Sequence, residues 1–170
     1  QMCIRDSQYS WWVFGGEDIK NDLIIFSGDQ TIFVRYKDEG YVTIDDWKSI
    51  KPEDLIAEMR QIQNNWKDQL KEEGRNYVEE LNWVYKPTFD EEKNAVYVSY
   101  EGSWNGKKGR YKSMQTNSIV LGRNGYLDLS FVTSITNETT KVELQQIANL
   151  AKDFTDGIDF LDGSKHADYK

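Results

Sequence analysis

The spacing of apolar residues predicts a long helix in the first half of the chain. Five of them recur at intervals of three or four, the spacing of one helical face: Leu55, Met59, Ile62, Trp66 and Leu70. Pro52 suits the first helical position and Gly74 the residue after the last turn. We therefore expect a helix over 52–73 that packs this face on a sheet. Trp66 then lies in the core, and its replacement by Ala should cost about 3–5 kcal/mol.

Alternation of apolar and polar residues predicts strands on both sides of this helix. Before it, β-rich runs occupy 23–26 and 31–36, and 41–44 is the expected antiparallel partner of the second run. After it, we expect a four-stranded antiparallel meander: from 77 until Pro87, 96–101, 111–121 and 127–133. Asn105-Gly106 and Asn124-Gly125 are hairpin sequences, and we expect Gly122 and Gly125 to adopt positive φ in a tight turn.

A second helix is predicted over 141–155. Thr140 and Glu143 fit a capping box, and Gly157 suits the helix end. Its apolar stripe would consist of Leu144, Ile147, Ala148, Ala151 and Phe154. Residues 158–161 could form a last edge strand. The fold class that follows is α+β: one domain over 8–162, an antiparallel meander sheet with two packed helices.

The two ends of the chain read differently from the rest. Residues 1–7 match the translation of a transposase adaptor used in sequencing libraries, so we interpret them as not native. Cys3 is the only cysteine, and the native domain would then contain neither a disulfide nor a cysteine-based metal site. Residues 163–170 are interpreted as the start of a C-terminal tail that leads toward a missing membrane anchor.

Charge narrows the classes of partner. The chain carries a net charge of −8, which counts against nucleic-acid binding and against docking on an anionic membrane surface. We expect no cofactor and no metal. His166 is the only histidine, lies in a polar stretch near the end of the chain, and is interpreted as a solvated side chain. The six tryptophans are interpreted mainly as packing residues, with exposed rings as the basis of an alternative carbohydrate-binding function.

An ordered set of short segments over roughly residues 9–170 resembles the bacterial family named domain of unknown function 2167, described as predicted membrane-anchored proteins. The matching segments are Gly40-Tyr41-Val42, Asp45-Asp46, Leu55, Gly74, Trp83, Pro87, Phe89-Asp90, Asn117, Leu121-Gly122-Arg123-Asn124-Gly125, Phe160, Gly163 and Ala167-Asp168-Tyr169. The order of helix, meander and helix is also similar to the PsbP and Mog1 type of α+β sandwich, as an analogy of fold alone.

The resemblance implies a location and leaves the activity open. It implies an extracytoplasmic, periplasmic domain of a membrane-anchored protein, and we expect a non-catalytic domain that binds an envelope protein or a glycan ligand. The candidate binding residues are Asn117, Arg123, Asp45, Asp46 and Trp47. A guanidinium at a turn can hold a carboxylate in a bidentate fork, so Arg123 is either an internal clamp or a recognition residue. A hydrolase that uses Asp45 or Asp46 is the enzymatic alternative.

Overall fold

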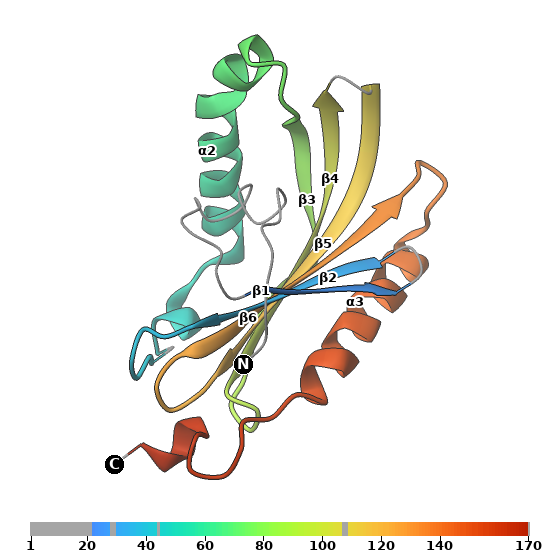
Figure 1. Ribbon diagram of the computed structural model, residues 1–170. Helices are drawn as coiled ribbons and strands as arrows, with labels where there is room; N and C mark the ends of the chain where they lie inside the picture. Colours follow the sequence, from blue (N-terminus) through green and yellow to red (C-terminus); the bar gives the residue numbers. More distant parts are fainter. Residues whose placement is uncertain (1–21, 28–29, 44, 107–108, 170) are drawn as a thin grey trace.

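A single antiparallel sheet organises the domain (Figure 1). The computed structural model describes residues 22–27, 30–43, 45–106 and 109–169, and the strand order in this part is β1-β2-β6-β5-β4-β3. The elements are β1 (Asp22–Ser27), β2 (Gln30–Lys37), the 3-10 helix η1 (Asp45–Ser49), α2 (Pro52–Glu72), β3 (Tyr77–Asp90), β4 (Ala95–Gly106), β5 (Gly109–Leu121), β6 (Tyr126–Ile135), α3 (Lys141–Asp156) and the 3-10 helix η2 (His166–Asp168).

The two α-helices lie on opposite faces of this sheet. Helix α2 packs Ile56 against Tyr100 of β4, and α3 packs Leu144 against Met114 of β5. Tyr100 pairs with Gln115, the residue next to Met114, and successive residues of a strand point to opposite faces. Figure 1 shows α2 and α3 on either side of the strands. The α+β class and the helix positions predicted from the sequence are confirmed.

The prediction of which face of α2 packs on the sheet is wrong: the helix is rotated about its axis by part of a turn from the expected orientation. Ile56 and Leu70 are the buried residues, with 2% and 7% of their surface exposed. Ile62 and Trp66 instead have exposed fractions of 47% and 55%. The apolar residues of α2 are numerous enough to form two rows, and the sheet takes the row that contains Ile56. Trp66 is therefore not a core residue.

Helix α3 is closer to expectation. Thr140 and Glu143 form the predicted capping box, and the apolar stripe faces the sheet through its buried members Leu144, Ala148 and Ala151. Phe154 is 39% exposed, but its ring makes an edge-to-face contact with the ring of Phe131, with the two ring centroids 5.5 Å apart. Residues 158–161 form no strand; they run as irregular chain toward η2.

Three strand predictions need correction. Residues 41–43 are not in a strand, because β2 already has β1 and β6 as its two neighbours. Pro87 does not end β3, which continues to Asp90 with register shifts around the proline; an edge strand tolerates a residue without an N–H. Asn105 pairs with Arg110 and Gly106 with Gly109, so Asn105-Gly106 forms the end of β4 and does not provide the central residues of a hairpin turn.

The glycines of the β5–β6 hairpin allow neighbouring groups to lie close to the backbone. The structure has four glycines with positive φ in its described part, and neither Gly122 nor Gly125 is among them. A Cβ on Gly122 would lie 2.7 Å from the ring of Phe160, and one on Gly125 would lie 2.0 Å from the carbonyl oxygen of Lys37.

Residues 1–7, and Cys3 with them, lie outside the part of the chain that the structure describes. Within it, no helix is both long and apolar enough to span a bilayer.

Candidate functional site

Asn117 lies in a patch of polar side chains at the centre of the sheet. Its strand neighbours are Val98 and Ser130, while Tyr100 pairs with Gln115 two residues away on the same face. We call Tyr100, Gln115, Asn117 and Ser130 the central polar patch. It lies on the α2 face, and all four residues are buried, with at most 9% of their surface exposed.

One amide organises part of this patch. Gln115 Nε2 donates to Ser130 Oγ at 2.8 Å and to Asn117 Oδ1 at 3.2 Å. Both Nε2 hydrogens of Gln115 are used, and the carbonyl oxygen of Asn117 is occupied. The hydrogen-bonding groups of the patch that this amide does not engage are Asn117 Nδ2 and the Tyr100 hydroxyl.

Two buried polar groups of the patch, Asn117 Nδ2 and the Tyr100 hydroxyl, form no hydrogen bond of good geometry in the described structure. More than about nine in ten buried polar groups in proteins have a partner, and an orphaned one costs about 1–3 kcal/mol. Burial raises the pKa of Tyr100 far above its ordinary value, a hydrogen-bonding interaction with the Asn117 side chain lowers it, and the Asp128 carboxylate raises it. Tyr100 is therefore a neutral O–H donor beside a neutral N–H donor.

Trp47 and Asn117 are brought to the same face of the sheet. Trp47 of η1 packs against Val96 and Leu121, and Leu121 shares its side of β5 with Asn117. Asp45 and Asp46 are the first two residues of η1, and their side chains are not among the described ones. The structure thus places η1 at one end of the face that carries the patch.

Arg123 lies elsewhere and holds the C-terminal segment. Its guanidinium donates to the carbonyl oxygen of Gly163 at 3.2 Å, and its backbone N–H donates to that of Ser164 at 2.9 Å. Arg123 follows the end of β5, six residues after Asn117, and extended backbone of that length spans at most roughly 20 Å. These contacts fit the internal-clamp hypothesis, with the backbone carbonyl of Gly163 in place of the expected carboxylate.

His166 is half-buried, and the solvated interpretation is wrong. Its Nε2 lies 3.0 Å from the carbonyl oxygen of Val42. The ring of Tyr41 stacks on His166 with centroids 4.5 Å apart and on Tyr169 at 3.9 Å. Residues that look polar and terminal in sequence are therefore packed on the loop after β2.

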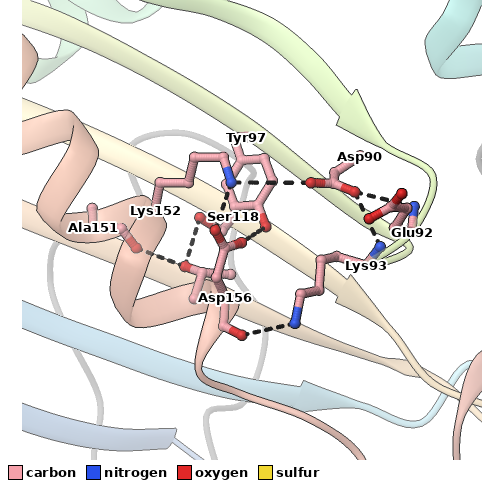
Figure 2. A network of polar contacts seen from close by, with 9 residues as sticks. Asp90, Glu92, Lys93, Tyr97, Ser118, Ala151, Lys152 and Asp156 are labelled. Atoms are coloured by element: carbon pink, nitrogen blue, oxygen red, sulfur yellow. Dashed lines mark hydrogen bonds and ion pairs between the residues drawn. The ribbon is translucent and has the colours of Figure 1, made fainter.

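A polar network at the edge of the α3 face was not predicted (Figure 2). The Tyr97 hydroxyl donates to Asp156 at 2.5 Å, and Lys152 Nζ lies 2.6 Å from the other oxygen of the same carboxylate. Lys152 also lies 4.0 Å from Asp90 and 4.6 Å from the centre of the Tyr97 ring. We call Tyr97, Lys152 and Asp156, with Asp90, the rim network. The spacing of four between Lys152 and Asp156 signals their ion pair, whereas no sequence signal places Tyr97 beside them.

Each group of the rim network is held in one protonation state. Burial and the hydrogen bond to Asp156 raise the pKa of Tyr97 far above its ordinary value. Burial alone would raise the pKa of Asp156, but the hydrogen bonds from Lys152 and Tyr97 keep it below its ordinary value. The bond to Asp156 raises the pKa of Lys152. Neutral Tyr97, anionic Asp156 and cationic Lys152 satisfy one another, which is the arrangement of a structural network.

Comparison with known proteins identifies the family. The family model described as protein of unknown function DUF2167 matches residues 18–170. The chain belongs to this family. No curated protein and no solved structure matches the DUF2167 chain.

The four described tryptophans of this DUF2167 chain lie at separate places. Trp66 is exposed on α2, Trp104 is buried, and Trp47 and Trp83 are half-buried at separate places. Trp83 Nε1 donates to the carbonyl oxygen of Pro52 at 3.1 Å, which fixes the start of α2 on β3. Among the described residues, no group of three His, Cys, Asp or Glu side chains could hold a metal ion.

Proposed function

We propose that this DUF2167 chain is a non-catalytic binding domain of a membrane-anchored protein of the bacterial envelope, and that the central polar patch binds a small neutral ligand. The observation that carries the proposal is a pair of buried donors, Asn117 Nδ2 and the Tyr100 hydroxyl, that lack a hydrogen bond of good geometry among the described residues. The anchored, periplasmic setting is supported by the family resemblance, and no described residue bears on it.

The two donors define the chemistry of the ligand. Both are neutral N–H or O–H groups, so they match an acceptor oxygen: a hydroxyl, an ether or an amide carbonyl. The Asp128 carboxylate, which acts on Tyr100, disfavours an anionic ligand. Neutral sugars and N-acetylated amino sugars fit these requirements, and this keeps a glycan ligand as the first candidate.

A titration with N-acetylglucosamine and its disaccharide tests the proposal. Binding to the wild-type chain is measured by calorimetry, together with the variants Tyr100→Phe and Asn117→Leu. Each variant removes one donor, and we expect each to weaken binding at least about tenfold, the equivalent of one hydrogen bond of about 1.4 kcal/mol. Tyr97→Phe on the opposite face is the matched control and should leave the affinity unchanged.

Two results would contradict the proposal. If none of the neutral sugars binds the wild-type chain, the glycan assignment is wrong. If Tyr97→Phe weakens binding as much as Tyr100→Phe does, the patch is not the site. Protease accessibility of the full-length protein in intact cells, compared with cells whose outer membrane has been permeabilised, tests the periplasmic location separately.

A further inference from the structure

Helix α2 presents an apolar row to solvent in addition to the row that packs on the sheet. Leu55, Ile62 and Trp66 lie within about 40° of one another around a helix, and about 80° from the buried row. Ile62 and Trp66 are 47% and 55% exposed, and Leu55 is half-buried. We call these three residues the outer apolar row.

The charges of α2 are divided between its two flanks. On the flank toward β3, Arg60 donates to the carbonyl oxygen of Leu81, at 3.1 Å from Nε, and Lys67 and Lys71 lie over the ring of Tyr77. All three basic side chains of the helix are therefore engaged by the sheet edge.

The opposite flank, beside the outer apolar row, is acidic. Asp54, Glu58 and Glu72 lie there on exposed turns of the helix, and none of them forms an ion pair with another described residue. Three carboxylates that have no ion pair within the described part of the chain thus border an exposed Trp and an exposed Ile, on a chain with a net charge of −8. Their field attracts cationic partners and repels anionic ones.

We propose that the outer apolar row of α2 is a docking surface for a basic amphipathic helix of a partner protein. Burial of Ile62 and Trp66 supplies the apolar contact, and Trp is one of the residue types enriched among those that dominate the binding energy of protein interfaces. Lys or Arg side chains on the flank of the incoming helix would pair with Glu58 and Glu72. A second copy is disfavoured because both copies would bring the same acidic flank, and an anionic membrane is disfavoured for the same electrostatic reason.

The test uses synthetic helices and the whole chain. The probe peptide carries Leu and Ile on one face and Lys on both flanks. One control peptide has the same composition in an order that abolishes the apolar face, and a second has Glu in place of every Lys. Binding is followed by fluorescence anisotropy of the labelled peptide at about 0.05 M and about 0.5 M salt, conditions that differ strongly in screening.

We expect only the basic amphipathic peptide to bind. Trp66→Ala should weaken its binding at least about tenfold with only a small change in melting temperature, because more than half of the Trp66 side chain is exposed. Glu58→Gln combined with Glu72→Gln should weaken binding at low salt and remove most of the salt dependence. Leu150→Ala is the matched control, since Leu150 is an exposed apolar residue of α3, with 60% of its surface accessible.

Four outcomes would overturn the proposal. Equal binding of the reordered peptide would show charge attraction without a docking surface. Binding of the acidic peptide would show that the acidic flank plays no part. Self-association that Trp66→Ala abolishes would assign the row to a second copy, and recruitment to vesicles with anionic lipid that Trp66→Ala abolishes would assign it to a membrane. The polar patch variants should leave peptide binding intact, so this proposal and the proposed function fail independently.

Discussion

Two tyrosines of β4 show how differently the same side chain can be used. Tyr97 and Tyr100 are each only 2% exposed, and three residues apart on a strand they point to opposite faces. The hydroxyl of Tyr97 is hydrogen-bonded to an ionised carboxylate of α3, whereas that of Tyr100 forms no hydrogen bond of good geometry with the described residues. The Tyr97 hydroxyl stabilises the fold, whereas burial of the Tyr100 hydroxyl lowers the free energy of unfolding.

Removal of each hydroxyl should therefore have opposite effects on stability. We expect Tyr97→Phe to lower the free energy of unfolding by about 1.5–3 kcal/mol, the range for a hydrogen bond to a charged group. Tyr100→Phe should leave it unchanged or raise it, because the variant no longer buries an orphaned hydroxyl. Urea denaturation of both variants measures this. Equal losses would show that Tyr100 has a partner in solution and would remove the physical basis of the polar patch as a binding site.

At the scale of elements, α2 is defined by which of its apolar rows meets the sheet. Ile56→Ala should cost about 2–5 kcal/mol, because Ile56 lies in the cluster with Leu81 and Tyr100. Ile62→Ala, six residues later on the exposed row, should cost less than about 1 kcal/mol, and so should Trp66→Ala. The two isoleucine variants form a matched pair for thermal unfolding. Similar losses for both would mean that the outer apolar row is covered within the monomer.

The existence of the elements could be predicted because it depends on local pattern. The capping box of Thr140 and Glu143 and the proline at the start of α2 are short-range signals, and both helices begin where these signals place them. The rotation of α2 could not be predicted, since its apolar residues support two rows and only the sheet decides between them. The pairing of β2 with β6 joins segments about a hundred residues apart, which no periodicity encodes.

Part of the candidate site could likewise be predicted from the sequence, and part depends on how the strands pair. Asn117 was predicted, but Tyr100 and Ser130 become its neighbours only through the register of β4, β5 and β6. Arg123 was predicted as a clamp or a recognition residue, and its contacts with the segment after α3 are those of a clamp. The sequence could not show that its target is the chain's own segment 163–164, because no pattern marks backbone carbonyls as partners.

At the scale of the whole molecule, the segment after α3 fastens to the end of the sheet. Phe160 packs against the α3-face core and fills the space above Gly122, and Gly122 itself forms a bridge with Lys165. Arg123 holds Gly163, and His166 contacts Val42. These contacts follow one another along the segment, so the last residues form a strap over the β5–β6 turn with several independent attachments.

Independent attachments predict a graded response to mutation. Arg123→Ala removes one side-chain bond at an exposed position, while the backbone bond from Arg123 to Ser164 remains. We expect a loss of less than about 1 kcal/mol in global stability and faster amide exchange confined to residues 163–169. Gly122→Ala instead pushes the ring of Phe160 aside and should speed exchange from 158 onward. Hydrogen exchange followed by mass spectrometry separates the two patterns, and a global loss of protection in Arg123→Ala would show that the strap and the sheet unfold as one unit.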